Sequence, residues 1–242
     1  MKFNKQSNTY TLIYIIVLVA IVGAGLALAS MSLKNKQQIN ADADKMQQIL
    51  ASVHVTTTDA DVVERFNSLI TESIVVNSEG KVIGNDGFKI DVQTESKIKD
   101  ISQRKLPVYI CDLGKKGKKY ILPVYGNGLW GPIWGYVALN DDGSTIFGAY
   151  FAHQGETPGL GAEIEKPAFS NQFDGKQMFK DGQFLPVAVV KAGQKPLKGE
   201  DYVDAVSGGT ITSKGVSAML DDCLSPYKAY LENLKKSNTT NL

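Results

Sequence analysis

The residues best suited to chemistry lie in one segment near the C-terminus, DAVSGGTITS, which runs from Asp204 to Ser213. Its two adjacent glycines let the backbone come close to a ligand, and its four hydroxyl side chains crowd the same place. An amphipathic pattern follows directly, so the segment leads into a helix whose first N–H groups lack partners and favour an anion. The segment fits a phosphate site, and it fits equally a plain glycine turn with a Ser or Thr helix cap.

A second segment, HQGETPGLG, begins at His153 and follows a predicted strand. Its three glycines and one proline predict a tight loop of fixed shape. His153 and Glu156 are residue types that perform acid–base catalysis, but no nucleophile lies near them in the sequence. We therefore assign no catalytic residue to this loop.

A third segment, GNGLWG from Gly126 to Gly131, matches the pattern G-x-G-x-x-G. A dinucleotide-binding segment of this form must open a helix and needs an acidic residue about twenty positions later. Here Pro132 and the strand-like IWGYVAL follow, and the acidic residue is missing. Two interpretations remain: a glycine-rich hairpin, or a turn in which the glycines let Trp130 present its flat face to a ligand.

Metal-binding residue types are sparse. The chain has two histidines and two cysteines, which are far apart in the sequence: His54, His153, Cys111 and Cys223. This spacing does not match a zinc site, so we predict no metal. We expect each cysteine to be a small buried apolar residue.

The strands that position these segments lie between Leu106 and Gly193. Short runs rich in β-branched and aromatic residues alternate with Gly, Asn and Asp clusters: LPVYICDL, KYILPVY, IWGYVALN and TIFGAYFAHQ, then FLPVAVVKAG. The first four predict consecutive antiparallel strands, and the fifth predicts one more strand. Ser213–Leu234 has apolar residues at helical spacing, with a break or kink at Pro226.

Residues before the strands predict smaller elements. Ala41–Val53 and Thr58–Ile70 have helical patterns, the second with Thr58 or Asp59 as its N-cap. Val75–Gly87 has the turn residues of a hairpin, and Lys89–Arg104 forms a connection. The fold class is therefore α+β, a twisted antiparallel sheet packed with helices.

The N-terminal region is apolar and uncharged. The 22 residues Leu12–Leu33 would span about 33 Å as a helix, enough to cross a bilayer core of roughly 30 Å. A cleaved signal peptide is the alternative, since Ala27-Leu28-Ala29 has the form of a cleavage site. Two lysines lie on each side of the span, so only the free amino group favours a cytoplasmic N-terminus.

The charge balance limits the partners. The chain has 26 basic and 25 acidic residues, which gives no basic field for nucleic acid. Without Lys2 and Lys5, the part beyond the span has 24 basic and 25 acidic residues, so it offers no polybasic patch for lipid headgroups.

Taken together, these segments resemble a known family. DAVSGGT, the upstream ETPGLG and GNGLWGPIWGYVAL, in this order behind a single apolar span, resemble the C subunit of the sodium-translocating NADH:quinone reductase. The resemblance covers the whole chain and is densest from about Leu106 to Leu220.

The resemblance implies specific roles for residues of this chain. Thr210 occupies the position that carries FMN through a phosphoester bond, and the expected recognition elements for a flavin transferase are Asp204, Ser207, Gly208 and Thr210. The remaining expected FMN-binding residues are Glu156, Thr157, Gly159, Leu160, Trp130, Lys191, Ser207, Gly208, Gly209 and Thr212. Within this set, Leu160 is expected to cover a ring face and Thr157 to bond the polar ring edge.

One residue departs from the family pattern. The family usually has alanine directly before the threonine, whereas this chain has Gly209. Because glycine is smaller and more flexible, we expect attachment to survive the difference.

The resemblance also implies the architecture and the function. It implies a cytoplasmic N-terminus (1–11), a transmembrane helix (12–33), a helical and hairpin region (34–104) and an FMN-binding domain (105–242), with the last two in the periplasm of a bacterium with an inner membrane. The implied function is electron transfer within a complex that oxidises NADH, reduces quinone and pumps sodium, with NADH bound by another subunit. The implied partners are the other membrane and redox subunits, a flavin transferase and the lipid bilayer.

Two alternatives remain open. One is the homologous flavin subunit of the ferredoxin-linked electron transport complex. The other is a membrane-anchored binding or assembly module without flavin.

Overall fold

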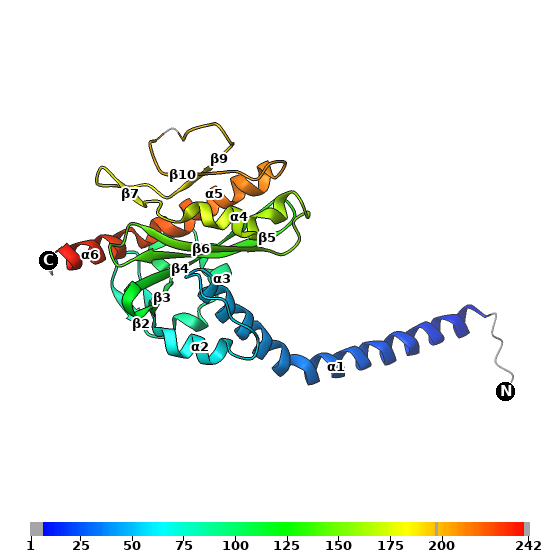
Figure 1. Cartoon of the computed structure of the whole chain (residues 1–242). Coiled ribbons are helices and arrows are strands. Elements are labelled where there is room, and N and C mark those ends of the chain that lie inside the picture. The colour runs from blue at the N-terminus through cyan, green and yellow to red at the C-terminus, as the bar shows by residue number, and fades with distance from the viewer. Residues whose placement is uncertain (1–6, 197, 240–242) are drawn as a thin grey trace. The chain divides into compact units, whose positions relative to one another are not determined.

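The computed structural model describes residues 7–196 and 198–239 (Figure 1). By its internal contacts the chain divides into two compact units, Met1–Lys45 and Met46–Leu242, and each is described by itself.

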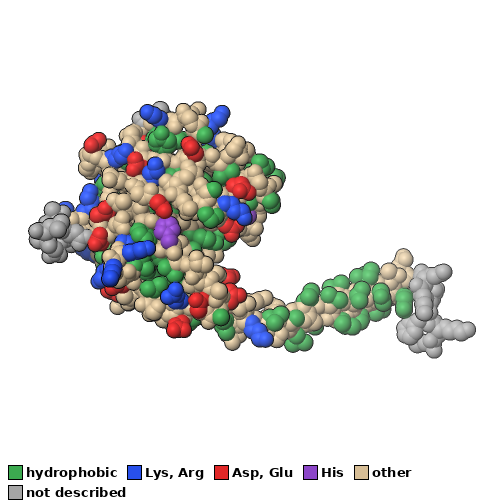
Figure 2. Space-filling model, viewed as in Figure 1, with side chains coloured by type: hydrophobic (Ala, Val, Ile, Leu, Met, Phe, Trp, Pro, Cys, Tyr) green, Lys and Arg blue, Asp and Glu red, His purple; other side chains and the backbone are tan. Residues whose placement is uncertain are grey.

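The first unit is the larger part of α1 (Asn8–Ala51). Within the described residues, α1 is the one helix long and apolar enough to cross a membrane. The apolar span and the predicted helix Ala41–Val53 are therefore parts of one helix, because the residues between them, KNKQQIN, include no Gly or Pro and are mostly good helix formers. Figure 2 shows apolar side chains along α1, and charges of both signs mixed over the visible face of the second unit.

The second unit is built on a six-stranded antiparallel sheet with the order β2-β1-β3-β4-β5-β6. Its strands are β1 (Ile70–Val76), β2 (Val82–Gly84), β3 (Leu106–Asp112), β4 (Lys118–Asn127), β5 (Pro132–Asn140) and β6 (Ile146–His153). The four predicted consecutive strands and the predicted hairpin are thus confirmed.

Helices cover both faces of this sheet (Figure 1). On one face, α5 (Thr210–Leu224) packs against β4, and the shared core also includes α4 (Pro167–Ser170). On the other face lie α2 (Val62–Leu69) and the last turns of α1, where Gln48 accepts a hydrogen bond from Trp134 Nε1 at 2.9 Å. Burial on both faces explains why β3 is an almost continuous apolar run rather than an alternating one.

Two predicted elements have different limits in the structure. The second helix begins at Val62 instead of Thr58, because the Thr58 N–H and hydroxyl both bind Asp61 Oδ1 in a preceding turn. It ends at Leu69 because β1 begins at Ile70. The segment FLPVAVVKAG splits into β8 (Gln183–Phe184) and β9 (Ala188–Val190).

The strands outside the main sheet form two small pairs. β8 pairs with β7 (Phe179–Lys180), and β9 pairs in parallel with β10 (Tyr202–Asp204). The connection before β3 contains α3 (Val92–Ser96) and 3-10 turns at Gly87–Lys89 and Ile101–Gln103. Further 3-10 turns are Gly114–Lys116, Gly161–Glu165 and Asn171–Phe173.

The predicted break at Pro226 is confirmed. α5 ends at Leu224, a 3-10 turn spans Ser225–Tyr227, and α6 (Lys228–Thr239) follows. A proline lacks the N–H that a continuous helix needs, so the helix is divided here.

The stretch of α5 from Gly215 to Met219 lies very close to the end of β4. A Cβ added at Gly215 would clash with the carbonyl oxygen of Asn127, and one at Gly126 would lie 2.8 Å from Met219 Cβ. These contacts fix the height of the helix above the strand, so both glycines serve close packing.

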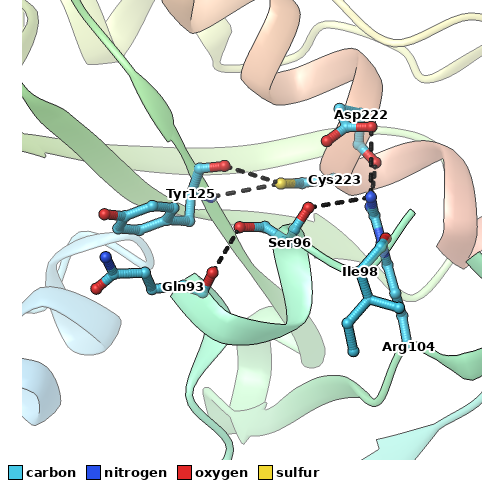
Figure 3. Close-up of polar contacts among 7 residues, drawn as sticks. All are labelled: Gln93, Ser96, Ile98, Arg104, Tyr125, Asp222 and Cys223. Carbon is cyan, nitrogen blue, oxygen red and sulfur yellow. Dashed lines mark hydrogen bonds and ion pairs between the residues drawn. The ribbon is translucent and has the colours of Figure 1, made fainter. Parts of the chain in front are cut away.

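The second half of α5 is held by Arg104, which is 6% exposed. Its guanidinium donates hydrogen bonds to the carbonyl oxygens of Ile98, Ser96 and Asp222 at 2.8, 3.1 and 3.2 Å. Figure 3 shows Arg104 between the connection and the helix, with Cys223 beside it bound to the backbone of Tyr125. A buried cation thus joins the segment before β3 to α5.

We predict that Gly215→Ala destabilises the protein. Alanine is favoured over glycine in a helix by about 1 kcal/mol, but the clash with Asn127 costs about 1–3 kcal/mol. Thermal unfolding followed by circular dichroism should show a lower Tm. The control is Gly155→Ala, which has open space around its new Cβ and should change stability by less than about 0.5 kcal/mol. A higher Tm for Gly215→Ala would contradict the close contact.

We also predict that Arg104→Met lowers the free energy of unfolding by about 2–4 kcal/mol, because three backbone carbonyl groups lose the buried guanidinium that donates to them. Arg104→Lys should recover only part of this loss, since one ammonium group cannot reach all three carbonyls. Denaturant unfolding of the purified full chain measures both values. A lysine variant as stable as the natural protein would show that the separate contacts do not matter.

Candidate functional site

Thr210 is the first residue of α5 and its side chain is exposed. The N-cap is Gly209, which has no side chain to bind the first turn. The hydroxyl of Ser213 points back instead and accepts the Val206 N–H at 3.0 Å. The helix therefore begins without a side-chain cap beside an exposed hydroxyl, an arrangement that suits a phosphate bound to that hydroxyl.

The loop that starts at Glu156 lies against this helix start. A Cβ at Gly208 would come within 2.6 Å of Leu160 Cδ2, and Gly208 has a φ of +75°. A Cβ at Gly209 would lie 3.3 Å from the Gly161 N and 3.1 Å from Val206 Cγ1. Position 208 thus requires glycine both because its φ is positive and because a Cβ would clash with Leu160. Alanine at position 209 would need small shifts of Val206 and of the Gly161 backbone.

Glu156 connects the three glycine-rich segments, Gly126–Gly131, Glu156–Gly161 and Ser207–Thr212. Its side chain is 5% exposed. Oε1 accepts the Trp130 N–H at 2.8 Å, and Oε2 accepts the Thr212 hydroxyl at 2.5 Å. The segments that the sequence separates by 26 and 56 positions therefore meet at one carboxylate.

The same three segments expose large apolar side chains. The exposed fractions are 48% for Leu129, 69% for Trp130, 43% for Leu160 and 56% for Ile211. Thr157 and Gly159 of the middle segment are exposed as well. Apolar surface beside an exposed hydroxyl and a helix N-terminus fits a ligand with a flat apolar ring and a phosphate.

Lys191 and Asp204 come to this region through a strand pair. Val190 pairs with Asp204, and the Ala205 N–H donates to the Val190 carbonyl at 2.7 Å, so Lys191 follows directly beside Ala205. Both side chains are exposed. The Asp204 N–H donates to Gln172 Oε1 at 2.9 Å, which anchors the backbone leading to Thr210.

Sequence reasoning missed Gln172, Leu129 and Ile211. Gln172 lies in a 3-10 turn 32 positions from Asp204, so no local pattern indicates the contact. Leu129 and Ile211 are neighbours of predicted site residues, and their apolar type inside polar segments was the available signal.

The cysteines take no part in this site. Cys111 and Cys223 are buried free thiols, as predicted, and burial raises the pKa of each to about 11. Neither is reactive as a thiolate at neutral pH. Among the described residues, no group of three or more His, Cys, Asp or Glu side chains is placed to hold a metal ion.

Comparisons with known proteins agree with the geometry. Residues 128–225 match the family model described as FMN-binding domain. The chain is 33% identical to the C subunit of the Na(+)-translocating NADH-quinone reductase of Vibrio anguillarum, over 91% of this chain and 92% of that protein. It is 34% identical to the corresponding protein of Neisseria meningitidis serogroup B, with 98% of each chain covered.

Solved structures give the same result. The crystal structure of the C subunit from Parabacteroides distasonis has a TM-score of 0.76 and 47% identity, over 82% of this chain and 96% of that one. For the crystal structure of NqrC from Shewanella oneidensis, the TM-score is 0.67 and the identity is 26%, over 81% of this chain and 99% of that one. With relatives matched over nearly their full length, the chain belongs to the NqrC family, the C subunits of the Na(+)-translocating NADH-quinone reductase.

Proposed function

We propose that this chain is an electron-transfer flavoprotein subunit that carries FMN on Thr210 through a phosphoester bond. The observation that carries the proposal is an exposed threonine at the first position of α5, where no side chain caps the helix. The match of residues 128–225 to the FMN-binding domain supports it. When bound, FMN supplies the redox chemistry, and the protein supplies attachment, orientation and electrostatic tuning.

Each segment of the site then has a distinct task. The first N–H groups of α5 and its dipole stabilise the phosphodiester charge beside Thr210. Ser207, Gly208 and Gly209 form the wall of the phosphate pocket and, with Asp204 and Thr210, the surface that a flavin transferase recognises. Gly208 supplies the left-handed backbone that turns this wall into the helix.

The ring of FMN would lie on the apolar surface next to Thr210. Leu160 covers one ring face, and Trp130 offers a second flat surface. The exposed side chain of Thr157 faces the polar edge of the ring. Lys191, exposed beside Ala205, offsets negative charge on the phosphate or the reduced ring.

The chain works as part of a complex in this proposal. Residues 12–33 anchor it in the bacterial inner membrane, 1–11 lie in the cytoplasm, and 34–104 and 105–242 lie in the periplasm. Electrons pass between redox centres of neighbouring subunits through this one, while NADH oxidation, quinone reduction and sodium pumping belong to the whole complex. The relatives named above favour this complex over the ferredoxin-linked one.

We predict that Thr210→Ala abolishes covalent flavin, because the methyl side chain has no oxygen for the phosphoester. The full chain is expressed with a flavin transferase in an exporting host, and a denaturing gel is viewed under ultraviolet light. The natural chain should fluoresce and Thr210→Ala should be dark. The control is Ser68→Ala, which removes an exposed hydroxyl from α2 on the other face of the sheet and should stay bright. A dark natural chain would support the module without flavin, and a bright Thr210→Ala would place the attachment elsewhere.

We also predict that the anchor is retained in the mature protein. The purified chain should keep the mass of residues Leu12–Leu33, and it should remain in the membrane after alkaline carbonate washing. A mature chain that begins just after Ala29 would instead show that this segment is a cleaved signal peptide. Protease added to spheroplasts should digest the part beyond residue 34. Full protection of this part would show that it lies in the cytoplasm.

A further inference from the structure

We propose that Glu156 is a positioning residue for flavin attachment: its buried carboxylate fixes the first turn of α5 and thereby the direction of the Thr210 hydroxyl. This inference rests on the proposed function, since it concerns the same site. Glu156 acts on attachment through its hydrogen bonds to Trp130 and Thr212, and not through a contact with the flavin ring.

The first argument is the pair of hydrogen bonds. Oε1 binds the backbone N–H of Trp130, and Oε2 binds the hydroxyl of Thr212, two residues after Thr210 on α5. Thr212 is 1% exposed, so its side chain points into the protein while that of Thr210 points out. Holding Thr212 therefore fixes the rotation of the first turn about the helix axis.

The second argument is that two glycines make room for this carboxylate. A Cβ at Gly128 would lie 2.5 Å from Glu156 Oε1, and a Cβ at Gly161 would clash with Oε2. Neither glycine has a positive φ, so backbone conformation does not require them. Glycines of two separate segments thus make the space for the side chain of Glu156.

The third argument is that the backbone of Glu156 is held as well. Its N–H donates to His153 Nδ1 at 3.2 Å, and His153 Nε2 lies 3.5 Å from Glu165 Oε2. His153 therefore accepts on Nδ1 and carries its proton on Nε2. Because both its backbone and its carboxylate are fixed, Glu156 holds α5 in a defined position relative to the loop.

The experiment separates position from charge. Glu156→Ala removes both hydrogen bonds. Glu156→Gln keeps them, because the amide oxygen can accept from Trp130 N–H while the amide nitrogen donates to Thr212 Oγ1. Thr212→Val removes the hydroxyl at nearly constant volume, and Thr212→Ser retains it.

The readout is covalent flavin per chain after a short, limiting exposure to the transferase, measured on the full chain by in-gel fluorescence. The covalent flavin per chain should be about tenfold lower or more in Glu156→Ala, since a misplaced nucleophile reacts far more slowly. Glu156→Gln should recover at least half of the natural level. The covalent flavin per chain should be about threefold lower or more in Thr212→Val, and Thr212→Ser should have the natural level.

The control for a general loss of stability is Arg104→Met, which weakens the far half of α5 without touching its first turn. If Arg104→Met loses attachment in proportion to its Tm as Glu156→Ala does, the role of Glu156 is merely structural and the inference is wrong. If Glu156→Gln is as dark as Glu156→Ala, charge rather than position matters, and the inference is also wrong. A dark natural chain would overturn the proposed function itself, whereas a bright Glu156→Ala beside a dark Thr210→Ala would overturn only this inference.

Discussion

A buried carboxylate has to be satisfied by hydrogen-bond donors, and this requirement organises the candidate site. Glu156 has little access to bulk water, so its oxygens need N–H and O–H groups from the protein. The donors come from Trp130 and Thr212, on the two other glycine-rich segments. The three segments are therefore not independent loops around a ligand. They form one junction, in which the buried contacts of Glu156 determine the positions of the exposed residues.

Much of the fold follows from local patterns. The strands between Leu106 and His153, the hairpin before them and the break at Pro226 were all predictable, because β-branched runs, turn residues and a proline act within a few positions. The limits of α2 were not predictable, because they depend on a turn at Asp61 and on Ile70 joining a sheet. The division of FLPVAVVKAG was also missed, since β9 finds its partner in β10, a pairing outside the reach of periodicity.

For the candidate site, the sequence indicated the segments that meet in the structure, but not the directions of their side chains. The glycines and hydroxyls around Thr210 fitted either a phosphate site or a capped glycine turn, and the resemblance implied FMN. The inward direction of Glu156 could not be predicted, because an acidic residue in a polar loop is normally expected to face water. The contacts of Gln172 and Arg104 were also beyond prediction, because each side chain binds a backbone group whose position only the folded chain determines.

The position of α5 also has a consequence for the order in which parts of the chain fold. The strands β3 to β6 pair with their neighbours in the sequence, so the sheet can form through short loop closures. The contact between Glu156 and Thr212 closes a loop of 56 residues, and it needs a helix that is synthesised near the end of the chain. Thr210 thus acquires its surroundings only after nearly all of the protein has folded. Under the proposed attachment of FMN to Thr210, a transferase that recognises this junction would modify only chains that have finished folding, so bound FMN would mark correctly folded molecules.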